Sequence, residues 1–115
     1  MSASLPKSER VSGKKAVDTL LKKGKWERTP HLRCCYLTGN GLEFNRVMVS
    51  VPKRNFKRAV RRNLLKRRMR EAYRQQKELL APKGIDLLFV YNDASLADYS
   101  VIRDEVAVLL QKIAA

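Results

Sequence analysis

The sequence has few of the residues that most enzymes use for acid, base or metal chemistry. It contains one histidine, two cysteines and 11 carboxylate side chains against 25 lysines and arginines. No nucleophile with a neighbouring base stands out, nor does a pair of carboxylates in the basic region. The five glycines are scattered and do not form a phosphate-binding loop. We therefore expect the polypeptide itself to lack catalytic activity.

The candidate ligands for a metal ion are sparse and badly spaced. Cys34 and Cys35 are adjacent, which excludes an unstrained disulfide that closes a useful loop. His31 precedes them on one expected strand, where alternate side chains point to opposite faces, so we expect packing rather than metal binding. We expect His31 to be a partly exposed structural residue. Asp86 and Asp93 flank an apolar run and could bind a cation, although acidic residues at strand ends more often serve turns.

Long apolar runs are also absent. No stretch approaches the roughly 18 residues that a membrane span needs, and residues 1–10 lack the apolar centre of a secretory signal. We expect a cytoplasmic protein with no membrane partner. A chain of 115 residues is long enough for one compact domain, so we predict a mobile N-terminus over 1–10 and a single domain over 11–115.

Positive charge is abundant and concentrated in one segment. Residues 53–74 hold eleven of the lysines and arginines and one carboxylate, Glu71, within a chain of formal net charge +14. Like charges at this density repel one another in a helix unless an anion neutralises them. The segment therefore predicts contact with an extended polyanion, and nucleic-acid phosphate fits best.

Apolar spacing predicts six elements in the order α-β-β-α-β-α. We expect helices over 12–24, about 55–80 and 95–115, and strands over 30–37, 44–51 and 85–91. Asn55 is a candidate cap for the central helix, and Ser95 with Asp98 resembles a capping box. The first two strands should pair antiparallel. The expected fold is a single small α/β (α+β) sandwich in which helices pack on a small mixed sheet.

The central helix should have two different faces. Leu65, Met69, Ala72 and Tyr73 follow helical spacing and should enter the core, while the arginines gather on the other side. Asn63 lies among these arginines and could reach a base edge, a ribose or a phosphate. Such a helix could enter the major groove of DNA, whereas the major groove of A-form RNA is too narrow for it. Composition alone does not decide between the two.

Residues 46–74, RVMVSVPKRNFKRAVRRNLLKRRMREAYR, closely resemble the bacterial ribonuclease P protein subunit. That family has a valine-rich strand ending in a Ser-Val-x-Lys-Lys-like run, then a helix with Ala-Val-x-Arg-Asn-Arg-x-Lys-Arg-x-x-Arg-Glu. The flanking elements also fit, so the resemblance covers nearly the whole chain. It implies a left-handed crossover between the two strands that the central helix joins.

The resemblance implies a non-catalytic protein subunit of a ribonucleoprotein endoribonuclease that removes the 5′ leader of precursor tRNA. Its partners would be the catalytic RNA and precursor tRNA, with no DNA expected. The holoenzyme would require Mg2+ held mainly by the RNA, and the protein alone would bind no cofactor. The alternative is a structural ribosomal or RNA-chaperone protein with a generic phosphate clamp.

Two sets of site residues follow from the resemblance and the charge pattern. The expected RNA-binding residues are Lys53, Arg54, Lys57, Arg58, Arg61, Arg62, Asn63, Lys66, Arg67, Arg70 and Arg74. The expected leader cleft, between the sheet and the N-terminal helix, comprises Val17, Leu21, Arg33, Cys35, Met48 and Ser50. Leu64 replaces the second arginine of the Arg-Asn-Arg core, with Arg61 and Arg68 as possible substitutes for its charge. Val17 and Leu21 stand where the family often has aromatic residues, so the sheet residues should carry more of the leader contact.

Overall fold

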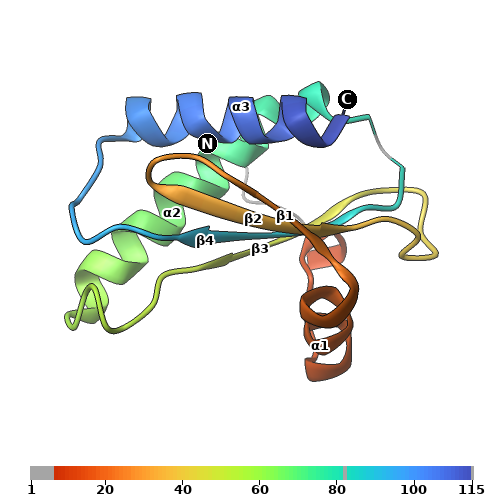
Figure 1. Cartoon of the computed structure of the whole chain (residues 1–115), viewed down its shortest axis with the longest axis horizontal. Coiled ribbons are helices and arrows are strands. Elements are labelled where there is room, and N and C mark those ends of the chain that lie inside the picture. The colour runs from red at the N-terminus through yellow and green to blue at the C-terminus, as the bar shows by residue number, and fades with distance from the viewer. Residues whose placement is uncertain (1–6, 82, 115) are drawn as a thin grey trace.

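The computed structural model describes residues 7–81 and 83–114 and forms a sheet with helices on both faces. Figure 1 shows α3 on one side of the sheet and α1 on the other. The helices are α1 (Lys14–Lys23), α2 (Ala59–Gln76) and α3 (Tyr99–Ala114), with 3-10 turns η1 (Lys7–Glu9) and η2 (Lys77–Leu79). The strands are β1 (Lys25–Arg28), β2 (Leu32–Leu37), β3 (Arg46–Ser50) and β4 (Asp86–Tyr91). The expected α/β sandwich is confirmed, with the additional strand β1.

The sheet is mixed, and its strand order is β1-β2-β4-β3. β2 runs antiparallel to β1 and β4, whereas β3 runs parallel to β4. The prediction that the strands now identified as β2 and β3 pair with each other was wrong, because β4 lies between them. β4 is almost continuously apolar and is covered on both faces, which suits a central position. α2 joins the parallel neighbours β3 and β4; the handedness of this crossover remains a prediction of the resemblance.

Both predicted helix caps were wrong. α2 begins at Ala59, with Arg58 at the N-cap position and no side-chain cap. The guanidinium of Arg62 instead donates hydrogen bonds to the carbonyls of Phe56 and Lys57, at 2.7 and 2.8 Å, and so orders the preceding loop. The capping box at Ser95 does not form either, because α3 begins four residues later and Ser95 bonds to Asp93.

The main core lies between the sheet and the helices α2 and α3. The α2 residues predicted to face the core are all buried, which confirms the assignment of that helix face. Tyr73 and Phe89 also pack ring against ring, with centroids 6.1 Å apart. The central members of this core are Leu65, Met69, Ala72, Tyr73, Ile102, Val106, Leu109 and Leu110 from the helices and Leu32, Cys34, Val47, Val49, Leu87 and Phe89 from the sheet.

α1 covers part of the opposite sheet face through a smaller cluster. Leu20 packs on Cys35 and Leu88, and all three are buried. Gly24, directly after α1, allows this close approach because a Cβ atom there would lie 2.4 Å from Sγ of Cys35. Within the described residues, no other helix covers this face (Figure 1).

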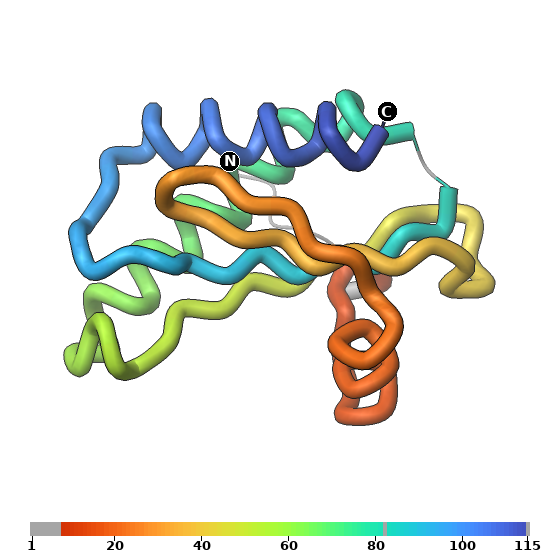
Figure 2. Tube along the Cα trace, viewed as in Figure 1, coloured from red at the N-terminus to blue at the C-terminus, as the bar shows by residue number. Residues whose placement is uncertain are grey.

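Two loops far apart in sequence meet at one end of the sheet. Figure 2 shows the 38–45 segment beside the start of β4. The amide of Asn40 donates to the Gly84 carbonyl at 2.9 Å, and the amides of Lys83 and Ile85 donate to the Asn45 side chain.

Within the described residues, no helix is long and apolar enough to cross a membrane.

Candidate nucleic-acid interface

The outward face of α2 and the loop before it carry the predicted RNA-binding residues. Because its core-facing residues are buried, the helix presents its cations to solvent. Within the described chain, most of these cations make no side-chain hydrogen bond or ion pair with another residue. These unpartnered cations are Lys53, Arg54, Lys57, Arg58, Arg61, Lys66, Arg67 and Arg70, and Asn63 is exposed among them.

Three arginines of α2 have partners within the protein. Arg62 holds the loop before the helix, as described above. Arg74 forms a paired contact with Glu71, with N–O distances of 2.8 and 2.6 Å, and these hydrogen bonds hold the pKa of Glu71 below its ordinary value. Arg68 donates to the carbonyl of Ala97 at 2.7 Å, so it points toward the β4–α3 loop and does not replace the charge missing at Leu64.

Arg10 also lies beside these cations, although the sequence analysis predicted a mobile terminus over residues 1–10. It forms a bridge with Val47 at the edge of β3, and the amide of Val11 donates to the Val47 carbonyl at 2.9 Å. Arg10 and Arg70 line a cavity of about 170 Å³ beside β3. Partial burial, followed by the charge of Arg10, lowers the pKa of Arg70. A phosphate between the two guanidiniums would relieve this repulsion.

Residues 1–6 of the predicted mobile terminus lie outside the described residues. The sequence signal that the chain is fixed here was the apolar residue Val11, directly after Arg10, whose side chain is buried in the structure.

The predicted leader residues of the sheet share the face that α1 partly covers. Met48 and Ser50 pair with Leu88 and Val90 of β4, which in turn face Cys35 and Arg33 of β2. Side chains at paired positions point to the same face, so the four predicted residues lie together. Arg33, Met48 and Ser50 are partly exposed.

Not every predicted cleft residue is open to a ligand. Cys35 is fully buried, and its thiol donates to the Leu20 carbonyl at 3.4 Å, so α1 covers it and a ligand cannot reach it. On α1, Leu21 is 46% exposed whereas Val17 is half-buried. The exposed surface therefore comes from Leu21 and the three sheet residues.

One ion pair lies at the end of this sheet face, where β3 and β4 begin. Arg46 makes two hydrogen bonds to Asp86, at 2.8 and 2.7 Å, and these raise the pKa of Arg46. Asp86 also accepts a hydrogen bond from the side chain of Asn40 at 2.9 Å. Both charges are thus satisfied internally, and Asp86 is not a free cation ligand.

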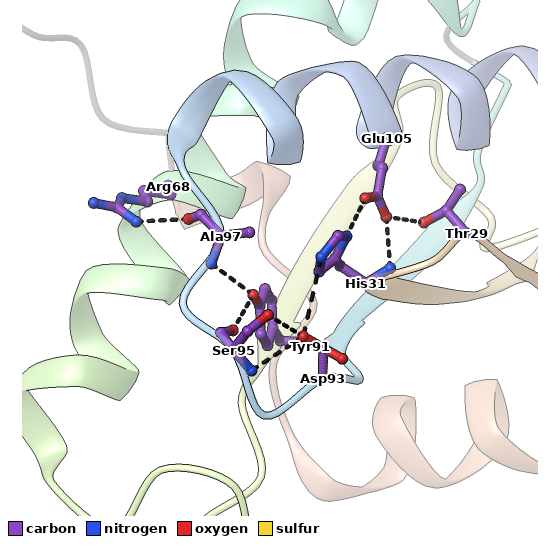
Figure 3. A network of polar contacts seen from close by, with 8 residues as sticks. All are labelled: Thr29, His31, Arg68, Tyr91, Asp93, Ser95, Ala97 and Glu105. Carbon is purple, nitrogen blue, oxygen red and sulfur yellow. Dashed lines mark hydrogen bonds and ion pairs between the residues drawn. The ribbon is translucent and has the colours of Figure 1, made fainter.

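His31 belongs to a polar network that ties the β1–β2 hairpin to α3 (Figure 3). Its ring lies between Glu105 and Asp93, and Thr29 donates to Glu105. The expectation of a partly exposed structural histidine is confirmed, since the ring is held by carboxylates and lies away from the basic helix. Asp93 is engaged by Ser95 as well.

The two cysteines are not suited to act as nucleophiles or metal ligands. Burial raises the pKa of both thiols, and Cys34 and Cys35 face opposite sides of the sheet. They are protonated at neutral pH. Among residues 7–81 and 83–114, no three His, Cys, Asp or Glu side chains gather closely enough to hold a metal ion.

Comparison with known proteins places this architecture in one family. The ribonuclease P family model matches residues 5–114. The ribonuclease P protein component of Thermotoga maritima is 30% identical over 118 residues, covering 98% of each chain. That of Porphyromonas gingivalis is 41% identical over 78 residues, which span 66% of this chain and 57% of the relative.

The solved structures agree in fold. The Thermotoga maritima protein superposes with a TM-score of 0.81 at 26% identity, covering 93% of this chain and 99% of the other. The Staphylococcus aureus protein gives a TM-score of 0.79 at 22% identity, covering 94% and 96%. With its basic helix set beside an open sheet face, this chain belongs to the ribonuclease P protein component family.

Proposed function

We propose that this chain is the protein subunit of ribonuclease P, which binds a catalytic RNA and the 5′ leader of precursor tRNA. The observation that carries the proposal is the set of cations on α2 and the loop before it that have no partner within the described residues, next to a partly uncovered sheet face. These eight lysines and arginines have no carboxylate partner in the part of the chain that the structure describes, and such a surface suits a folded RNA backbone. The family relationship supports the same partner.

The two surfaces are suited to two different RNA segments. The cations of α2 and its preceding loop would bind the phosphates of the RNA subunit. This face, with Met48 and Ser50 partly exposed on the sheet and Leu21 exposed on α1, has the mixed apolar and polar character that suits single-stranded RNA. Arg10 and Arg70 lie at the β3 edge, where the two surfaces meet, so one RNA assembly could contact both at once.

The chemistry would belong to the RNA. Among the described residues, no three His, Cys, Asp or Glu side chains gather closely enough to hold magnesium, and Asp86 and Glu71 are paired with Arg46 and Arg74. Magnesium bound by the RNA would supply the activated water for phosphodiester hydrolysis. The protein would hold the leader in place and neutralise phosphates near the cleavage site.

Reconstitution tests the proposal directly. The protein is mixed with a bacterial ribonuclease P RNA and a precursor tRNA at low magnesium, with RNA alone and protein alone as controls. We expect cleavage of the leader by the pair and none by the protein alone. RNA compaction without stimulated cleavage would favour a structural or chaperone role and would overturn the proposal.

A further inference from the structure

Trp26 occupies an unusual position on the edge strand β1. Its indole is 40% exposed, which makes it the most exposed aromatic side chain among residues 7–81 and 83–114. It pairs with Cys35, so it lies on the same sheet face as Met48 and α1. An exposed indole offers a large, flat apolar area and an N–H donor for contact with a partner.

Arg33 extends this ring into a composite surface. The central guanidinium carbon of Arg33 lies 4.4 Å from the centroid of the Trp26 ring. This cation–π contact holds both planar groups on the open sheet face. A nucleobase can stack on an indole, and a guanidinium beside it can stack further or bind the adjoining phosphate.

A cavity next to Trp26 and Arg33 has a net positive charge, which suits the phosphate of a nucleotide. It measures about 350 Å³ and is lined by Trp26, Glu27, Arg28, Arg33 and Lys112. Lys112 reaches it from α3 and donates to the Arg28 carbonyl at 3.3 Å. Three cations therefore surround one carboxylate, and within the described chain none of the three is ion-paired. An aromatic platform inside a cationic rim suits single-stranded RNA.

We propose that Trp26 and Arg33 form a stacking platform for a base of the 5′ leader, at the β1 end of the sheet face. This inference rests on the proposed function and adds a subsite to it. β1 and β3 are the opposite edges of the sheet, separated by three strand spacings, or roughly 14 Å. A leader entering beside β3 reaches Trp26 only after crossing the sheet, so the contact requires a leader several nucleotides long.

The chain offers a direct reporter, because Trp26 is its single tryptophan. Holoenzyme reconstituted from the full chain and the RNA is titrated with precursor tRNA while tryptophan emission is recorded. We expect saturable quenching by precursor with a long leader and little change with mature tRNA or a one-nucleotide leader. Tight precursor binding with unchanged emission would overturn the platform.

Substitution supplies the second test. Trp26→Leu should weaken binding of long-leader precursor by about 5- to 150-fold, the loss expected for one base stacked on an aromatic ring. Trp26→Phe should lose less, and Arg33→Gln should show the same leader dependence without changing the indole. The matched control is Leu96→Ala, which removes a side chain that is 41% exposed in another part of the molecule and should change nothing.

The outcomes separate the platform from the proposed function. Equal losses for precursor and mature tRNA would show that Trp26 acts through the fold, and the platform would be rejected. Wild-type preference for precursor combined with unaltered binding by Trp26→Leu and Arg33→Gln would reject the platform alone. Failure of the wild-type protein to stimulate cleavage would reject the proposed function.

Discussion

His31 and Glu105 are joined twice, since the ring Nδ1 lies 2.5 Å from one carboxylate oxygen and the His31 amide donates to the other at 2.8 Å. Glu105 is 9% exposed and belongs to α3, whereas His31 lies between β1 and β2. The hydroxyl of Thr29 donates to the same carboxylate. A buried carboxylate is tolerated because these donors surround it. The pair therefore holds the β1–β2 hairpin, which contains Trp26, against α3.

Glu105→Gln should lower the free energy of unfolding by about 1 to 3 kcal/mol, because the charge-assisted hydrogen bonds are lost. Burial raises the pKa of Glu105, but the hydrogen bonds from Thr29 and His31 outweigh it and hold the pKa below its ordinary value. The stabilisation is thus present above the unfolded-state pKa of about 4.3 and is lost as pH falls through the lower folded-state value. Urea unfolding of both proteins between neutral pH and about pH 3 checks this. A difference in stability that does not shrink below pH 4 would contradict it.

Arg67→Ala should weaken binding to the ribonuclease P RNA without changing the melting temperature. Arg67 is exposed and, within the described residues, makes no side-chain hydrogen bond or ion pair. Losing one phosphate contact should reduce the slope of log affinity against log salt by about 1. Binding measured over a series of salt concentrations, together with thermal melting, tests this.

The matched control for Arg67 is its neighbour Arg68, which donates to Ala97 inside the protein. Arg68→Ala should lower stability by about 1 kcal/mol and change the salt slope less than Arg67→Ala does. If Arg68→Ala reduced the slope more than Arg67→Ala, the outward face of α2 would be wrongly assigned.

Leu65→Asp should unfold the domain. Leu65 is fully buried between α2 and the sheet, and an unpaired carboxylate there costs several kcal/mol against a typical total of about 5 to 15. Leu65→Ala should remain folded but lose about 2 to 5 kcal/mol through the cavity it leaves. Circular dichroism and urea unfolding measure both effects. A folded Leu65→Asp with unchanged stability would refute the proposed packing.

Ser50→Asp should weaken binding of precursor tRNA to the holoenzyme and spare mature tRNA. Ser50 is partly exposed at the end of β3, on the sheet face proposed to hold the leader, where a new negative charge would repel phosphate. Ser100→Asp adds the same charge to an exposed position of α3 and serves as the control. Equal effects of Ser50→Asp on both tRNA forms would show that the leader does not follow this face.

The sequence predicted the elements whose patterns are long and regular. The helical spacing of Leu65, Met69 and Tyr73 identified the core face of α2, and the alternation of Val47 and Val49 identified β3. β1 was missed because it is short and carries Lys, Trp, Glu and Arg, with neither face fully buried. Trp26 was overlooked with it. Strand order was wrong because local patterns do not reveal which distant segment lies alongside a strand.

The sequence by itself determined that this chain carries a cationic helix suited to a polyanion, because charge density and helical period are local properties. Only the tertiary structure decided which cations are free. Arg68 is turned toward Ala97 and Arg74 is paired with Glu71, while Arg10 is brought beside Arg70 by the bridge to β3. The pairing of the strands likewise placed Trp26, Arg33, Met48 and Ser50 on one face. These relationships depend on contacts between residues far apart in the chain, which sequence spacing does not specify.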